Sequence, residues 1–175
     1  MREQRAFTLI ELIVALALAV TVLTLGVPSF RDLIRNNHFL TKVDELVAAL
    51  QLTRSEAVER GVRVTLCKSA DGTTCAADGG YDQGWIVFVD PNNNGAVDAN
   101  EEMVRVFEGM SAGAGVTLTG NTPVARYVSY TADGVARLAS GAFQAGTLTA
   151  CMPPKARRIV ISSVGRVKVT EATCI

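Results

Sequence analysis

The sequence predicts an α+β fold in which one long N-terminal helix packs on an antiparallel β-sheet head. Two observations predict it. A helical pattern covers residues 7–60, first as an apolar run and then as an amphipathic repeat. From residue 61 onward, β-branched or alternating segments are separated by turns rich in glycine, asparagine and aspartate. The 175 residues have room for one globular domain, so we expect a single head over 61–175.

The N-terminal segment has the pattern of a membrane anchor. Residues 1–6, MREQRA, carry Arg2 and Arg5, and residues 7–27 form an apolar run in which Glu11 is the only charged residue. A helix of about 20 residues spans the hydrocarbon core of a bilayer. The basic flank predicts that the N-terminus stays in the cytoplasm. We therefore expect one inner-membrane span over 7–27, with the rest of the chain on the side where disulfides form.

After Pro28 the helical pattern continues as an amphipathic repeat. Its apolar positions recur at steps of three and four residues and are Phe39, Val43, Leu46, Val47, Leu50 and Ala57. Charged residues between them face solvent. Gly61 suits the C-terminal cap of this helix. Pro28 predicts a kink, because proline removes one backbone hydrogen bond.

The head is predicted to contain strands joined by short turns. The expected strands are 62–67, 84–90, 102–107, 115–118, 125–131, 146–152, 158–162 and 166–170.

Four cysteines, Cys67, Cys75, Cys151 and Cys174, allow three disulfide pairings. We favour Cys151 with Cys174, which ties the C-terminus to an earlier strand, and Cys67 with Cys75, which closes a short loop. The alternative is four reduced thiols in a cytoplasmic protein, which requires the N-terminal segment to be a buried helix. No CxxC pair occurs, and the one histidine, His38, is distant in sequence, so no metal site is predicted.

Glu11 is the unusual feature of the apolar run. A carboxylate at bilayer depth costs at least ~2.5–3.5 kcal/mol on insertion scales, so such a residue usually has a function. The alternative is that Glu11 lies close enough to the interface to be hydrated. The segment RAFTLIELIVALALAVTVLTLGVPSF resembles the class III signal and N-terminal helix of type IV pilins and type II secretion pseudopilins.

This resemblance implies how the N-terminus is processed. In that family a prepilin peptidase removes the leader before the phenylalanine and methylates the new amine, which here implies a leader of residues 1–6 and a cut between Ala6 and Phe7. The family normally has glycine where this chain has Ala6. Glu11 becomes the fifth mature residue, which in the family pairs with the N-terminal amine of a neighbouring subunit.

Later segments narrow the resemblance. ELVAALQLTRSEAVERGVRVTLC, GWIVFVDPNNNG and SSVGRVKVT are similar to the GspH/FimT branch, which includes the minor pilins FimT and FimU. The resemblance implies a pilin-like fold, other pilins or pseudopilins as partners, contact with inner-membrane lipid, and a periplasmic head that later joins a filament on the cell surface. Secretion pseudopilins share the same domain, so the resemblance is compatible with both a type IV pilus and a type II secretion system.

Charge is unevenly distributed although the formal net charge is zero. Residues 71–108 carry eight acidic and one basic residue, a net of −7, and residues 150–175 carry five basic and one acidic, a net of +4. An acidic middle and a basic end predict that only the end meets a polyanion.

The basic end contains Gly165, Arg166, Val167 and Lys168. In a strand, Arg166 and Lys168 share one face. With Lys155, Arg157 and Arg158 we expect them to form a compact patch for phosphates of double-stranded DNA. FimT-like proteins that act in DNA uptake carry Gly-Arg-x-Arg at this position. Lys168 stands in place of the second arginine, so the positive charge is kept but the forked pair of guanidinium donors is lost. The alternative is a solvated strand edge.

The segment from Asp90 to Glu101 has the spacing of an EF-hand calcium loop. Its flanks read as strands, however, and Asn94-Gly95 is a strong hairpin signal, so we favour a turn between two strands. No hydrolase, metalloprotease or phosphate-loop motif occurs, and neither an enzyme nor a cofactor is predicted. We expect a minor type IV pilin that joins or primes a filament and contacts DNA, with a minor pseudopilin of type II secretion as the alternative.

Overall fold

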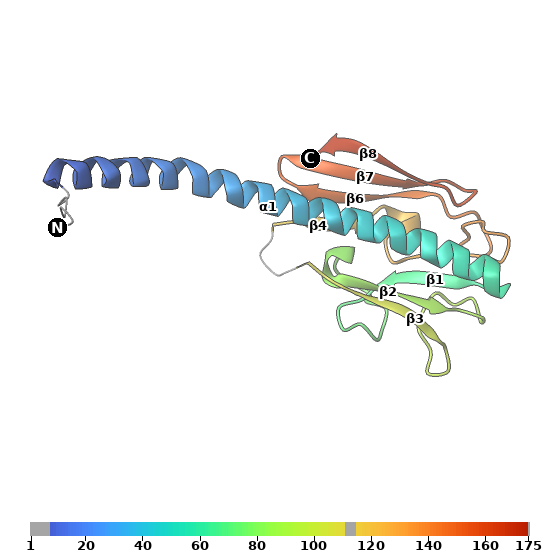
Figure 1. Cartoon of the computed structure of the whole chain (residues 1–175). Helices are drawn as coiled ribbons and strands as arrows, with labels where there is room; N and C mark the ends of the chain where they lie inside the picture. Colours follow the sequence, from blue (N-terminus) through green and yellow to red (C-terminus); the bar gives the residue numbers. More distant parts are fainter. Residues whose placement is uncertain (1–7, 111–114, 175) are drawn as a thin grey trace. The chain divides into compact units, whose positions relative to one another are not determined.

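The structure is a computed structural model that describes residues 8–110 and 115–174, without the side chains of residues 25, 26, 28 and 29. One α-helix, α1, spans Leu9–Arg60, and the described residues after it form the strands β1 to β8 (Figure 1). The predicted α+β class is therefore confirmed. The chain divides into two compact units, Met1–His38 and Phe39–Ile175, which we describe in turn.

The first unit contains the N-terminal part of α1. Its large apolar side chains are exposed, among them Leu9, Ile10, Leu12, Ile13, Leu16, Leu18, Val22 and Leu23. Within the described residues, no helix has the length and apolar character that crossing a membrane requires. The predicted span over 7–27 begins at Phe7, outside the described residues. The helix is continuous across Pro28, whose side chain is not described, so the predicted kink stays a prediction.

The head contains two antiparallel sheets. In the first sheet the order is β3-β2-β1-β5, and in the second it is β4-β6-β7-β8. The strands of the first sheet are β1 Val64–Lys68, β2 Gly84–Val89, β3 Met103–Glu108 and β5 Tyr127–Tyr130. Those of the second are β4 Thr117–Gly120, β6 Gly146–Met152, β7 Lys155–Ile161 and β8 Val167–Thr173. Short 3-10 helices, η1 Tyr81–Gln83 and η2 Thr122–Val124, lie between strands.

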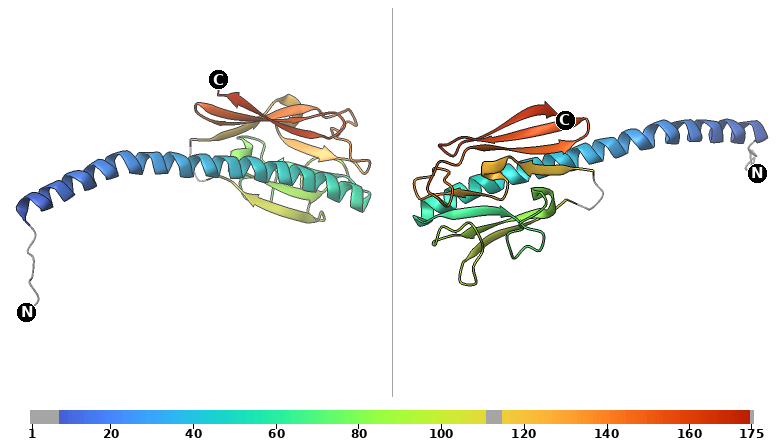
Figure 2. Two further views of the ribbon diagram at one scale, coloured as in Figure 1. Left: turned by 45° about the horizontal axis from the view of Figure 1, so that its top comes forward. Right: turned by 180° about the vertical axis from the view of Figure 1, so that it is seen from behind.

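The core of the head forms where residues 39–60 of α1 pack against the inner faces of both sheets (Figure 2). The predicted apolar positions of the helix are confirmed: Phe39, Val43, Leu46, Leu50 and Ala57 are buried, and Val47 packs against the same cluster. The strands contribute the side chains that pack against this part of the helix, because every second residue of a strand points to the same face of the sheet. All residues of the main cluster lie between Phe39 and Val167, so the second unit, Phe39–Ile175, contains its own core, made by the head together with the part of α1 that packs on it.

The strand predictions are right in number and order for the described residues, and they differ at the ends. β6 matches its predicted bounds. β7 begins at Lys155, earlier than predicted, because Lys155 already pairs with Met152 of β6 and only Pro153 and Pro154 lie between the two strands. The last strand was predicted to begin at Arg166. In the structure β8 begins at Val167, so Arg166 lies in the turn before the strand.

Candidate functional site

Three reciprocal hydrogen bonds join Thr8 and Glu11 at the N-terminus of α1. The backbone N–H and the hydroxyl of Thr8 donate to Glu11 Oε2 at 2.9 and 2.8 Å, and the Glu11 N–H donates to the Thr8 hydroxyl at 3.4 Å. This is a capping box, which satisfies amide groups that a helix N-terminus leaves unpaired. Glu11 thus has a local partner in the single chain. The predicted processing residues, Ala6 and Phe7, lie outside the described residues.

Both disulfides have the pairing that the sequence favours. Cys67 joins Cys75 with a Cα–Cα distance of 5.6 Å, and Cys151 joins Cys174 with 5.5 Å. The first bond holds the loop after β1 over the outer side of the first sheet, where Cys67 is buried with Ile86 and Phe88. The second bond fastens the chain immediately after β8 to β6.

The turn between β7 and β8 carries the glycine of the basic motif. The Gly165 N–H donates to the Ser162 carbonyl at 2.8 Å, and the Arg166 N–H donates to the Ser162 hydroxyl at 3.1 Å. Gly165 has φ +77°, and a Cβ there would lie 2.5 Å from the carbonyl oxygen of Gly134 and 2.8 Å from a ring carbon of Tyr130. The site therefore requires glycine both for its backbone and for its space.

Arg54 of α1 ties this turn to the neighbouring loop. Its Nε donates to the Gly134 carbonyl at 2.9 Å and its Nη2 to the Val164 carbonyl at 3.4 Å. Next to it, burial raises the pKa of Tyr130 to about 12, against a smaller opposing effect of Arg54. The sequence did not predict that Arg54 and Tyr130 lie beside the Gly165 turn. The helical repeat assigned Arg54 to solvent, and no local pattern indicates that two loops meet at its side chain.

The basic residues of the C-terminal region do not form the compact patch that the sequence predicts. Arg158 and Lys168 are exposed on the outer face of the second sheet. Arg157 is their neighbour in sequence but lies on the inner face, where it forms an ion pair with Glu171 of β8. Adjacent strand residues point to opposite faces, and this separates Arg157 from Arg158.

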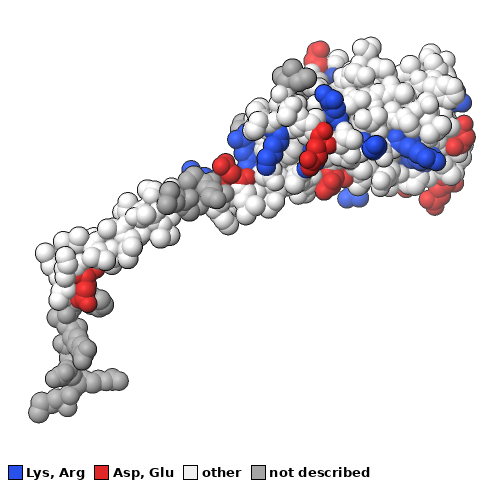
Figure 3. All heavy atoms as spheres, turned by 90° about the horizontal axis from the view of Figure 1, so that it is seen from above, with Lys and Arg blue, Asp and Glu red and all other residues white. Residues whose placement is uncertain are grey.

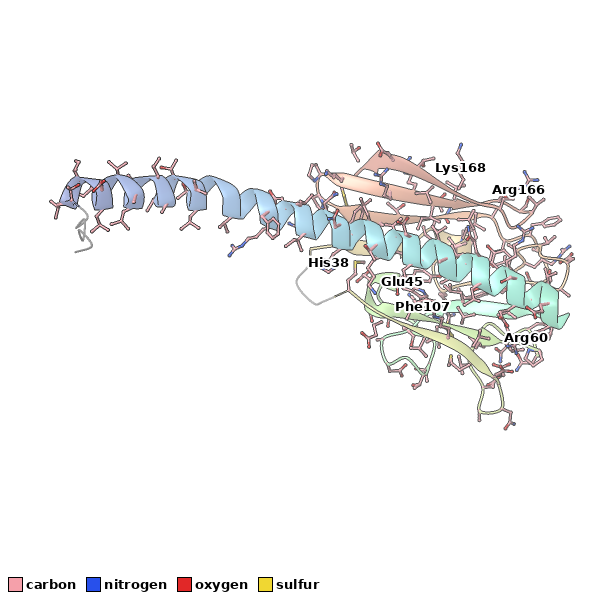
Figure 4. All side chains as sticks on the ribbon, in the orientation of Figure 1. His38, Glu45, Arg60, Phe107, Arg166 and Lys168 are labelled. Atoms are coloured by element: carbon pink, nitrogen blue, oxygen red, sulfur yellow. A yellow bond between two sulfur atoms is a disulfide. The ribbon has the colours of Figure 1, made fainter. Side chains whose placement is uncertain are left out.

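The remaining two basic residues lie at opposite ends of β7. Lys155 is its first residue, and Arg166 comes after its last residue, in the turn to β8. Figure 4 labels Arg166 at this turn and Lys168 on β8. On the side of the head seen in Figure 3, basic side chains are interspersed with uncharged and acidic ones. The structure therefore places Arg158 and Lys168 on one face of the second sheet and Arg157 on the other, with Arg166 exposed in the turn that precedes β8.

The Asp90–Glu101 segment connects β2 to β3, which pair antiparallel, so the predicted hairpin is confirmed. Asp90 is buried and accepts hydrogen bonds from the Thr65 hydroxyl and from the backbone N–H groups of Asn94 and Gly95. In the described residues, no group of three or more acidic, histidine or cysteine side chains has a geometry suited to a metal ion. Asp90 acts here as the internal anchor of the loop.

Comparison with known families identifies the chain. Residues 42–165 match the family model described as type II transport protein GspH, and residues 1–27 match the prokaryotic N-terminal methylation motif. The chain belongs to the GspH family. As a member of it with a pilin-type N-terminus, this GspH-family protein is a minor pilin or pseudopilin, a subunit of a type IV pilus or of a type II secretion system.

Two crystal structures of one solved protein support the fold of this GspH-family protein. The type IV minor pilin FimU of Pseudomonas aeruginosa, in space group P21, matches with a TM-score of 0.56 and 21% identity over 77% of this chain and 90% of that chain. A second crystal form, P65, gives 0.53 and 20% over 75% and 91%. The minor pseudopilin EpsH of the Vibrio cholerae type 2 secretion system gives 0.47 and 13% over 75% and 94%. No curated protein matches the chain.

Proposed function

We propose that this GspH-family protein is a minor pilin of a type IV pilus. It contacts DNA without sequence preference through the outer face of its second sheet and the turn between β7 and β8. In this proposal, residues 7–27 anchor the chain in the inner membrane, and prepilin peptidase cuts between Ala6 and Phe7. Glu11 then pairs with the amine of a neighbouring pilin in the filament. The head lies in the periplasm before assembly and on the cell surface afterwards.

The DNA contact is supported by one observation above all: Arg158, Lys168 and Arg166 are exposed on or beside the second sheet. The carboxylate nearest in sequence, Glu171, is occupied by Arg157 on the inner face. Phosphate contacts by arginine and lysine fix a protein on DNA but carry no base information, so binding should be indifferent to sequence. The Gly165 turn fixes the backbone from which Arg166 projects.

The test is a fluorescence-anisotropy titration of the full chain, in neutral detergent, with labelled duplex DNA at several salt concentrations. About three phosphate contacts imply a log–log salt slope near −3. Arg166→Gln with Lys168→Gln should weaken binding and flatten the slope by about 2. Arg105→Gln, an exposed cation on β3 of the other sheet, is the matched control and should bind like wild type. Equal binding by the double variant and wild type rejects the DNA role.

A minor pseudopilin is the second candidate, and the family model itself favours it, because its description is that of a type II transport protein. In that case the head meets secretion partners, and the exposed cations are a solvated sheet face. This candidate would be established if the wild-type protein does not bind DNA at low salt and is purified together with a secretion complex.

Processing is tested separately by intact-mass analysis of the assembled protein. We expect a mature chain that begins at a methylated Phe7. A chain that begins after residue 26 would indicate an ordinary secretory signal and exclude the pilin-type anchor. Replacing Ala6 by glycine is the control for the departure from the family pattern, and it should be cleaved at least as fast.

A further inference from the structure

The outer face of the second sheet carries, beside Arg158 and Lys168, a set of threonine side chains that the function proposed above does not use. The pairing register places one row of side chains across all four strands: Thr119 of β4, Thr149 of β6, Arg158 of β7 and Thr170 of β8. The next row contains Thr147, Val160 and Lys168. We call the surface made by these seven residues the threonine face.

The burial pattern confirms which way these residues point. Leu118, Leu148 and Ile159, which alternate with them along the strands, are fully buried in the core. Thr119, Arg158 and Lys168 are exposed, whereas Thr149 and Thr170 are half-buried between their neighbours. Within the described residues, no hydrogen bond is formed by the hydroxyl groups of Thr119, Thr149 and Thr170. These groups are therefore available as donors to a ligand.

The threonine face carries positive charge and no carboxylate. Across β4, β6, β7 and β8, Glu171 is the single acidic residue, and it lies on the inner face with Arg157. The outer side of the first sheet differs, because loops cover it that carry the exposed Asp71, Asp78 and Asp98. A polyanion is repelled from that side and attracted to the threonine face.

The spacing of the two cations suits a phosphate chain. Lys168 is opposite Val160, two residues along β7 from Arg158, so Lys168 and Arg158 are diagonal neighbours. Diagonal positions in an antiparallel pair are about 7–8 Å apart. Successive phosphates of one nucleic-acid strand have a comparable spacing. Threonine hydroxyls beside arginine and lysine are a usual set of phosphate donors.

We propose that the threonine face is a backbone-binding surface for DNA, on which Arg158 and Lys168 neutralise phosphates of one strand while the hydroxyls of Thr149 and Thr170 donate hydrogen bonds to them. This inference rests on the proposed DNA role and extends the contact from the Gly165 turn across the sheet. It assigns binding to neutral residues that no basic motif identifies.

The experiment separates hydroxyl contacts from charge contacts. In the full chain in neutral detergent, Thr149→Val with Thr170→Val keeps the β-branched shape and removes only the hydroxyls. Duplex DNA should bind about tenfold more weakly, since each hydrogen bond to a phosphate is lost. The salt slope should stay unchanged, because no charge is removed. Arg158→Gln should weaken binding and also flatten the slope by about 1.

Thr173→Val is the matched control, because Thr173 is exposed on β8 but alternates onto the other face. It should bind DNA like wild type. If wild type binds and Arg166→Gln weakens binding, while the threonine pair and Arg158→Gln have no effect, the threonine face is rejected and the proposed function stands. If wild type fails to bind at low salt, both are rejected. If the threonine-face variants change only salt-dependent self-association, the face meets an acidic protein surface and the inference is wrong.

Discussion

Gly165 lies directly against Tyr130, at a distance that leaves no room for a side chain: a Cβ on residue 165 would come within 2.8 Å of the tyrosine ring. The tyrosine is itself fully buried on β5 of the first sheet, whereas Gly165 belongs to a turn of the second. This contact therefore links the two sheets next to the exposed side chain of Arg166.

Gly165→Ala should destabilise the protein more than an alanine at an open glycine. Gly141 has a similar φ of +85° with no atom within 4 Å, so Gly141→Ala measures the backbone cost alone, about 1–2 kcal/mol. Gly165→Ala adds the clash with Tyr130 and Gly134, and we expect a total of about 2–4 kcal/mol. Urea unfolding followed by Trp85 fluorescence measures both. Equal losses at the two glycines would contradict a steric role for Gly165.

Glu11→Ala should lower incorporation into filaments without lowering membrane insertion. The variant removes the carboxylate proposed to pair with a neighbouring amine, and it removes a charge from the apolar run. Thr8→Ala is the control, because it breaks the capping box but leaves the carboxylate in place. Quantitative immunoblots of sheared pili and of membranes provide the two readouts. The assembly role is wrong if Thr8→Ala lowers incorporation as much as Glu11→Ala does.

Removal of either disulfide should cost stability, and the cost should rise slowly, with the logarithm of the length of the loop that the disulfide closes. The Cys67–Cys75 pair is separated by 8 residues and the Cys151–Cys174 pair by 23. Chain-entropy arguments give about 2.5 and about 3.4 kcal/mol, respectively. Double serine variants of each pair, compared by urea unfolding, test the order. A larger loss for the shorter loop would show that packing around the buried Cys67 outweighs loop closure.

Asp71 should make stability depend on pH in the acid range. The Thr73 N–H, together with the Thr74 hydroxyl and N–H, holds the pKa of the Asp71 carboxyl well below its usual range. A carboxyl whose pKa is lower in the folded state stabilises that state above its unfolded pKa of about 3.9, and this contribution is lost as the pH falls further. The stability difference between wild type and Asp71→Ala should be full at pH 7 and shrink below about pH 4.

The control for Asp71 is Asp78→Ala, at an exposed aspartate of the same loop. Unfolding midpoints in urea between pH 7 and pH 2 give both comparisons. A difference between wild type and Asp71→Ala that does not change with pH would mean that the hydrogen bonds of the carboxylate make no contribution to folding.

Much of the head could be predicted from local pattern, because alternation and turn residues act over a few positions. β6 shows this most clearly, since its small and polar residues alternate with buried ones between two well-marked turns. The helix face from Phe39 to Ala57 was likewise predictable from its repeat.

The candidate site was less predictable, because it depends on pairing between distant strands. Alternation alone places Arg157 and Arg158 on opposite faces, but only the register shows that Glu171 is opposite Arg157. The row of Thr149 and Thr170 beside Arg158 also exists only in the folded sheet. Arg54 could not be predicted for the same reason, since its partners are backbone carbonyls of two loops far along the chain.

The position of Cys174 sets the order of events when the protein matures. Cys174 directly follows β8 and Cys151 lies in β6, so the covalent link between them cannot close before β8 has been synthesised and has taken its place beside β7. β8 is consequently the last strand to be secured, and with it the surface that carries Lys168. A chain cut at any point between Cys151 and Cys174 lacks this link and keeps Cys151 as a free thiol, so a thiol-reactive label distinguishes it from a chain in which β8 has been secured.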